Sequence, residues 1–187
     1  MINSPHPATT ARIDTFRIRV LVVMGVSGCG KTEVGRAVAQ RWQARFEDAD
    51  HWHSPEAVAQ MAAGIPLSDA DRAPWLERLR GQIIAATPPG GRTVLACSAL
   101  RRRYRDTLRA GQDGVLFVHL SGSQELIAGR MAARTDHYMP ATLLDSQFAA
   151  LEVPGPEEAV TVSIDQPLEG VVEEVWKVLA QHTGSLL

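Results

Sequence analysis

The chain has 187 residues, of which 45% are hydrophobic and 21% charged, and its formal net charge at pH 7 is −2. This length suits one domain with a complete core, and the composition is that of an ordinary globular protein. The charge balance leaves no basic footprint for nucleic acid, and no apolar run approaches the ~20 residues of a bilayer-spanning helix. We therefore expect neither nucleic acid nor a membrane as a partner.

Residues 1–18 lack the apolar core of a signal peptide and are expected to form a flexible tail. Residues 19–187 are expected to form the folded domain. The two cysteines, Cys29 and Cys97, do not suggest a disulfide framework, which favours a reducing cytoplasmic setting.

Short apolar runs alternate with segments of helical periodicity along this domain. The expected strands are 19–24, 46–50, 93–97, 115–120 and 160–164. The expected helices are 31–45, 55–63, 71–86, 101–110, 123–133, 140–151 and 168–179. The third helix is expected to start near Asp71, because Pro74 fits only a first helical turn. Continuously apolar strands separated by helices are typical of a parallel sheet covered on both faces, which predicts a five-stranded α/β fold.

A glycine-rich segment directly follows the first expected strand and precedes a helix. It consists of Gly25, Val26, Ser27, Gly28, Cys29, Gly30, Lys31 and Thr32, which satisfies the pattern G-x-x-x-x-G-K-[ST] in full. In such a loop the main-chain amides point at phosphate oxygens, the lysine reaches the β- and γ-phosphates and the threonine hydroxyl ligates Mg²⁺. The strand and helix on either side disfavour the alternative of a simple connecting turn. The segment therefore predicts that the chain binds a nucleoside triphosphate.

Polar side chains follow the second, third and fifth expected strands, and ligands of such folds bind at the carboxyl ends of the strands. After the second strand, Asp50 is the best candidate to accept a proton from an acceptor hydroxyl or to hold metal-bound water, and capping a helix is its alternative role. Asp48 is expected to be structural. His53 is expected to hydrogen-bond a substrate hydroxyl, because the ligand spacing of a zinc site is absent from the sequence.

Two arginines, Arg130 and Arg134, are four residues apart and therefore share one face of an expected helix. One interpretation is a solvated basic face. The other is a lid at about residues 130–140, which would cover the nucleotide, exclude water and bring an arginine to the transferring phosphate. Cys29, inside the glycine-rich loop, adds the hypothesis that activity is sensitive to oxidation.

Several further blocks carry a resemblance that the glycine-rich loop alone does not. They are Gly64-Ile-Pro-Leu-Ser-Asp-Ala-Asp-Arg-Ala-Pro-Trp-Leu76, Cys97-Ser-Ala-Leu-Arg-Arg-Arg-Tyr-Arg-Asp106, His137-Tyr-Met-Pro140 with Leu144-Asp-Ser-Gln-Phe148, and Asp165-Gln-Pro-Leu168. Together with the loop and Asp48-Ala-Asp50, these blocks strongly resemble the bacterial-type gluconate kinases. The resemblance implies a P-loop kinase fold with a lid, related to shikimate and adenylate kinases, over about residues 19–180.

The resemblance also implies an activity, namely ATP- and Mg²⁺-dependent phosphorylation of D-gluconate at its 6-hydroxyl, with a homodimer as the expected assembly. The implied catalytic residues are Lys31, Asp50, Arg130 and Arg134. Those expected at the nucleotide, besides the loop, are Arg130, Asp165, Gln166 and Pro167. Gluconate is expected to meet Arg72, Arg101 and Arg105 through its carboxylate, and Asp50, His53, His137 and Gln147 through its hydroxyls.

Two alternatives stay open at this point. The first is a P-loop kinase for another small hydroxy acid such as shikimate, and the second is a regulator that binds ATP without turnover. The chain also has Arg101 where the gluconate kinases usually have lysine, and Asp136 where they frequently have glycine. Both differences bear on the affinity for the acceptor.

Overall fold

The computed structural model describes residues 18–133 and 141–183. Its centre is a five-stranded sheet in which every pair of neighbouring strands is parallel and the order is β2-β3-β1-β4-β5. The strands are β1 (Val20–Met24), β2 (Arg45–Asp48), β3 (Thr93–Ala96), β4 (Val115–Ser121) and β5 (Val160–Ser163). The predicted five-stranded α/β fold is confirmed.

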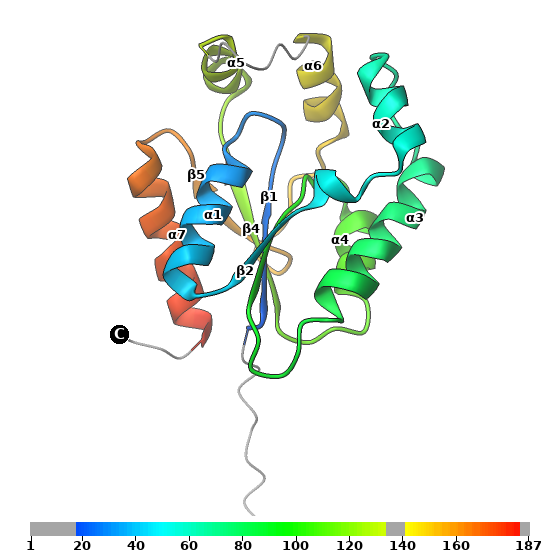
Figure 1. Ribbon diagram of the computed structural model, residues 1–187. Coiled ribbons are helices and arrows are strands. Elements are labelled where there is room, and N and C mark those ends of the chain that lie inside the picture. Colours follow the sequence, from blue (N-terminus) through cyan, green and yellow to red (C-terminus); the bar gives the residue numbers. More distant parts are fainter. Residues whose placement is uncertain (1–17, 134–140, 184–187) are drawn as a thin grey trace, which may run out of the picture.

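Helices cover both faces of this sheet (Figure 1). One face packs against α1 (Lys31–Trp42) and α7 (Leu168–Thr183), and the other against α3 (Asp69–Leu79) and α4 (Arg102–Arg109). The remaining helices are α2 (Pro55–Ala62), α5 (Gln124–Ala132) and α6 (Ala141–Ala150), with a 3₁₀ turn at Ala49–Trp52 and a π-helical turn at Arg80–Ile84. In Figure 1, α5 and α6 lie beyond the carboxyl ends of the strands. No helix in the described part of the chain is long and apolar enough to cross a membrane.

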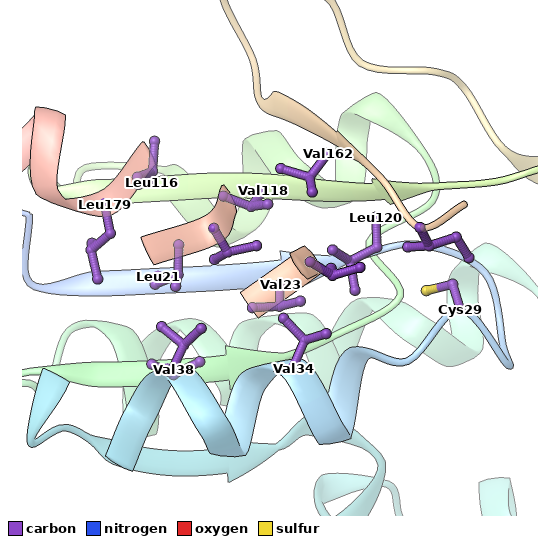
Figure 2. Packing of buried hydrophobic residues seen from close by; sticks show 14 of the residues in the cluster. Leu21, Val23, Cys29, Val34, Val38, Leu116, Val118, Leu120, Val162 and Leu179 are labelled. Carbon is purple, nitrogen blue, oxygen red and sulfur yellow. The ribbon is translucent and has the colours of Figure 1, made fainter. Parts of the chain in front are cut away.

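The core is divided by the sheet into two apolar layers, because alternate side chains of each strand point to opposite faces. All five residues of β1 are buried, and Leu21 and Val23 point into the layer shared with α1 and α7. Figure 2 shows Val34 and Val38 of α1 below these side chains and Leu179 of α7 on the same side of the sheet. The central strand is thus immobilised on both faces, and it carries the glycine-rich loop at its end.

The start of α3 differs from the prediction by two residues. The helix begins at Asp69, because Ser68 and Asp71 form a reciprocal capping box in which each side chain binds the other's backbone N–H. Pro74 therefore lies inside the helix, beyond the first turn to which the prediction assigned it. Trp75 and Leu76 are buried next to it, and their packing favours the helix despite the proline.

Other boundaries also differ from the prediction, and two of them have a local cause. The first helix ends at Trp42, before 45, because Gln43 adopts a left-handed conformation with φ 55°. The second strand ends at Asp48, before 50, because the Asp48 side chain accepts a hydrogen bond from the Asp50 amide and caps the 3₁₀ turn that follows. Asp50 is consequently a turn residue beside the sheet edge.

Candidate functional site

The glycine-rich loop leaves the carboxyl end of β1 and passes directly into α1. Gly30 is the N-cap of this twelve-residue helix, with φ 97°, and no side chain in the described part of the chain caps the first helical turn. A Cβ atom built on Gly30 would meet nothing within 4 Å, so the loop is open on this side. Uncapped amides at the positive end of a helix fit a phosphate group. The predicted loop is therefore arranged as a phosphate site.

Side-chain hydrogen bonds help to hold the loop in its present form. Nζ of Lys31 donates to the carbonyl oxygen of Val26 over 3.0 Å, which folds the lysine across its own loop. The amide of Ser27 donates to Oε1 of Gln147 over 2.6 Å, from a residue 120 positions away in α6. The structure thus brings Gln147, which was expected at the gluconate hydroxyls, to the phosphate loop.

Oxygen ligands gather beside Thr32, the last residue of the loop motif. Its hydroxyl donates to Oδ2 of Asp48 over 3.0 Å, and Oδ1 of Asp48 accepts from the amide of Asp50 over 3.2 Å. A hydroxyl and one or two carboxylates, completed by water and phosphate oxygens, fit the ligand preference of Mg²⁺. Asp48 was expected to be structural, and the geometry places it in the candidate site. The D-x-D pattern at the end of the second strand was the signal that could have identified it.

A pocket of about 200 Å³ lies on the other side of the loop. Its lining combines the loop and α1 with Arg130 of α5 and residues after β5, namely Gly28, Cys29, Gly30, Glu33, Val34, Arg130, Ile164, Gln166, Pro167, Leu168 and Val171. The Nη2 group of Arg130 donates to the carbonyls of Ile164 at 2.6 Å and Gln166 at 3.2 Å, and so joins α5 to this wall. Asp165 stands between these two residues, and its amide bonds to the Ser163 hydroxyl. The predicted nucleotide residues Arg130, Gln166 and Pro167 are thus brought together.

An arginine cluster lies on the opposite side, where α3 meets α4. The Asp69 carboxylate accepts hydrogen bonds from Nη1 of Arg101, at 3.1 and 3.3 Å, and from Arg103 and the Tyr104 hydroxyl. The guanidinium of Arg72 is 5.9 Å from the centre of the Tyr104 ring. The Tyr104 hydrogen bond and the arginine charges hold the pKa of Asp69 below its ordinary value. Asp69 was missed at the sequence level, although it stands in the block of residues 64–76 that carries the resemblance.

The His53 ring is stacked on Trp75, with ring centroids 4.3 Å apart and planes 12° apart. The indole of Trp75 is itself fixed by a 2.9 Å bond to the Ala49 carbonyl. Nδ1 of His53 is buried and has no hydrogen-bond partner among the described residues. Burial lowers the pKa of His53, against an opposing effect of Asp50, so the ring is favoured in its neutral form. A neutral imidazole can both donate to and accept from a substrate hydroxyl.

Arg105 does not lie in the arginine cluster to which the sequence assigned it. Its side chain is 2% exposed, and Nε and Nη2 both donate to the Glu158 carboxylate. Its Nη1 donates to the carbonyls of Ala99 and Leu100, each at 3.2 Å. The buried carboxylate of Glu158 takes the position expected for a ligand's carboxylate, so the geometry does not support direct binding of substrate by Arg105. The predicted residues Arg134 and His137 lie outside the described residues.

Comparison with known proteins places this geometry in a family. The family model described as Shikimate kinase matches residues 27–168. The gluconokinase of Gluconobacter oxydans (strain 621H) is 46% identical over 158 residues, covering 84% of this chain and 89% of that protein. The thermoresistant gluconokinase of Escherichia coli (strain K12) is 40% identical, with 86% and 93% covered. The crystal structure of a gluconokinase from Sinorhizobium meliloti 1021 is 41% identical, with a TM-score of 0.80 over 90% of this chain and 95% of that one.

The solved structures of shikimate kinases show a likeness in fold alone. The shikimate kinase of Acinetobacter baumannii, solved with shikimate, has a TM-score of 0.62 at 16% sequence identity. The gluconokinases exceed this identity more than twofold over most of both chains. The chain therefore belongs to the gluconokinase family, within the larger group of P-loop kinases that the Shikimate kinase model describes.

Proposed function

We propose that this chain is a gluconokinase, which transfers the γ-phosphoryl group of ATP to the 6-hydroxyl of D-gluconate and releases 6-phospho-D-gluconate and ADP. The observation that carries the proposal is the position of two sites at one end of the sheet. A phosphate loop follows β1, and an arginine cluster built on Arg72 and Arg101 lies beside the loop after β3. The gluconokinase names of relatives that are 40–46% identical over most of the chain support this choice of acceptor.

The nucleotide would bind along the phosphate loop and in the pocket beside Arg130. The uncapped amides at the start of α1 would bind phosphate oxygens, and Lys31 would exchange its bond to the Val26 carbonyl for the β- and γ-phosphates. Gln166 and Pro167, with the neighbouring Asp165, would contact the adenine. Thr32, Asp48 and Asp50 would hold Mg²⁺, partly through water, and the ion would neutralise charge on the phosphates.

The acceptor would bind between Asp50 and the arginine cluster. Arg72 and Arg101 would hold the gluconate carboxylate, because a guanidinium binds a carboxylate with two parallel hydrogen bonds. His53, His137 and the amide nitrogen of Gln147 would contact its hydroxyls. Asp50 would orient the 6-hydroxyl or accept its proton.

The helix α5 and the segment after it would complete the site. We propose that residues 130–140 close over the nucleotide, so that Arg130 and Arg134 stabilise the transferring phosphoryl group while water is excluded. Water exclusion matters because an open site would hydrolyse ATP without making product. We also propose that the protein acts as a cytoplasmic homodimer, and light scattering of the purified chain tests the assembly.

A coupled assay for ADP release tests the proposed activity directly. Purified protein with ATP and Mg²⁺ is offered D-gluconate, shikimate and several other sugar acids, and gluconate is expected to give the highest kcat/KM. Shikimate belongs in the panel because the Shikimate kinase model matches residues 27–168. Preferential turnover of shikimate would refute the gluconokinase assignment. Tight ATP binding without ADP release on any acid would favour a regulator.

A further inference from the structure

The loop from Cys97 to Arg101 has an unusual backbone conformation at its centre. Ala99 has φ 43°, in the left-handed region that residues with a Cβ atom rarely adopt. Ala99 is also only 1% exposed, so this backbone conformation lies in the protein interior and not in a surface turn. A non-glycine residue keeps such a conformation only when its surroundings hold it there, and such residues cluster at functional sites.

Arg105 is the side chain that holds the centre of this loop, and the amide of Glu152 also donates to the Leu100 carbonyl over 2.9 Å. Nη1 of Arg105 bonds the two successive carbonyls of Ala99 and Leu100, and the rest of its guanidinium is occupied by Glu158. Both charged side chains are buried, with Arg105 2% and Glu158 8% exposed. Removing two charges from water is costly, and their attraction often does no more than offset the cost. The pair is therefore better explained by the conformation that it imposes than by the stability that it adds.

The same loop connects the two halves of the candidate site. At its start, the carbonyl of Ser98 accepts a hydrogen bond of 3.3 Å from the amide of Gly25, the first residue of the phosphate loop. At its end, the Arg101 side chain reaches Asp69 in the arginine cluster. A shift of the backbone at Ala99 or Leu100 would therefore move Arg101 relative to the phosphate loop.

We infer that Arg105 and Glu158 are positioning residues, which lock the 97–101 loop and thereby set the orientation of Arg101 toward the acceptor's carboxylate. This inference rests on the proposed function, in which Arg101 binds gluconate. It replaces the direct ligand role expected for Arg105 with a role that acts through another residue. The loss caused by disturbing the pair should consequently fall on the acceptor much more than on ATP.

The test compares Arg105→Lys with Arg109→Lys, a matched control on the same helix. Arg109 also contacts Glu158, through a 2.7 Å bond to its main-chain carbonyl, and its guanidinium lies 5.0 Å from the Phe117 ring centre. It has no hydrogen bond to the 97–101 loop among the described residues. A lysine at 105 keeps the charge but lacks the planar fork that holds two carbonyls and a carboxylate together. Arg105→Lys is expected to raise the KM for gluconate about tenfold or more and the KM for ATP less than twofold.

Circular dichroism establishes that each variant is folded, and Glu158→Gln is measured as a second disturbance of the pair. Arg109→Lys should match the unsubstituted protein in both KM values. A folded Arg105→Lys or Glu158→Gln protein with an unchanged gluconate KM would overturn the inference. So would equal rises in both KM values, because that result indicates general loosening.

The unsubstituted protein in the same assay separates this inference from the proposed function. If it phosphorylates gluconate and Arg105→Lys does so with the same KM, only the inference fails. If it phosphorylates another acid of the panel instead, the gluconokinase assignment fails and the KM comparison is made with that acid. If no acid is phosphorylated, both fail together.

Discussion

The hydroxyl of Thr32 donates a 3.0 Å hydrogen bond to Oδ2 of Asp48, and this bond joins the end of the phosphate-loop motif to the end of β2. The second carboxylate oxygen of Asp48 accepts from the Asp50 amide, so the carboxylate is fixed at both ends. The Asp48 side chain thus orients the Thr32 hydroxyl, which would ligate Mg²⁺. It also orients the turn that carries Asp50, the candidate base. We therefore propose that Asp48 is a central residue for Mg²⁺ binding.

We expect Asp48→Asn to lower kcat by about 10- to 100-fold and to raise the Mg²⁺ concentration needed for half-maximal activity. The amide keeps the size of the side chain but removes the charge that favours a bound cation. A magnesium titration of initial rates measures the effect. Glu47→Gln is the control, because Glu47 bonds the Trp52 indole at 3.1 Å and Arg45 rather than Thr32. An unchanged magnesium dependence in folded Asp48→Asn would contradict this role.

The chain's two lysines allow a second comparison, since Lys31 lies in the phosphate loop and Lys177 is exposed on α7. Lys31→Ala is expected to lower turnover by about three orders of magnitude, because the charge facing the β- and γ-phosphates is lost. Lys177→Ala should retain full activity. Steady-state rates and circular dichroism of both variants provide the measurement, and near-normal turnover in folded Lys31→Ala would refute the assignment.

The sheet and the phosphate loop could be predicted because each depends on neighbours in sequence. Apolar strand runs and the glycine spacing of residues 25–32 are local patterns, and β1 and the loop lie where they indicate. Arg105 could not be assigned in this way, because its partner Glu158 is 53 positions away. The sequence shows an arginine at this position, and the resemblance suggests that it binds a carboxylate. Neither tells whether that carboxylate belongs to the substrate or to the protein.

Gln147 illustrates the same limit. Its bond to the Ser27 amide crosses 120 positions of sequence, and no local pattern records it. Asp69 was missed for another reason: an aspartate at the start of a helix has an ordinary explanation as a residue that interacts with the helix dipole. Only the three donors that converge on its carboxylate distinguish it from such a residue.

The arginine cluster leads to a prediction about the affinity for the acceptor. Arg72→Ala is expected to raise the KM for gluconate by about 10- to 100-fold, the cost of losing a hydrogen-bonded charged partner, with little change in the KM for ATP. Arg80→Ala is the control, because Arg80 directly follows the last residue of α3 and pairs with Glu77 at the surface. Equal losses for gluconate and ATP in Arg72→Ala would argue against a carboxylate-binding role.

The two cysteines are expected to resist modification, contrary to the hypothesis of an oxidation-sensitive loop. Cys29 and Cys97 are each 1% exposed. Burial raises the pKa of the Cys29 thiol, against an opposing effect of Lys31, and raises that of Cys97 to about 12. Because the thiolate is the reactive form, N-ethylmaleimide at pH 7.5 should label neither thiol in folded protein and both in urea. Mass spectrometry showing rapid labelling of folded Cys29 would restore the hypothesis.

His119 gives the protein a predictable loss of stability in acid. The side chain is 2% exposed on β4, and its Nδ1 has no hydrogen-bond partner within the described ranges. Burial, with a smaller contribution from the Arg105 charge, lowers the pKa of His119 below its ordinary value of 6.5. The unfolded chain therefore binds a proton at a higher pH than the folded chain does. The stability that this histidine contributes is complete above pH 6.5 and is lost as the pH falls through the folded-state pKa.

Urea unfolding at pH 7.5 and pH 5.5 measures this loss, and His119→Leu should lose less unfolding free energy between the two than the unsubstituted protein. Some loss will persist in that variant, because burial also lowers the pKa of His53. His182→Gln is the control, since His182 is exposed on α7, and it should show the same pH dependence as the unsubstituted protein. If His119→Leu and His182→Gln destabilise equally on acidification, protonation of the buried imidazole is not a source of the loss.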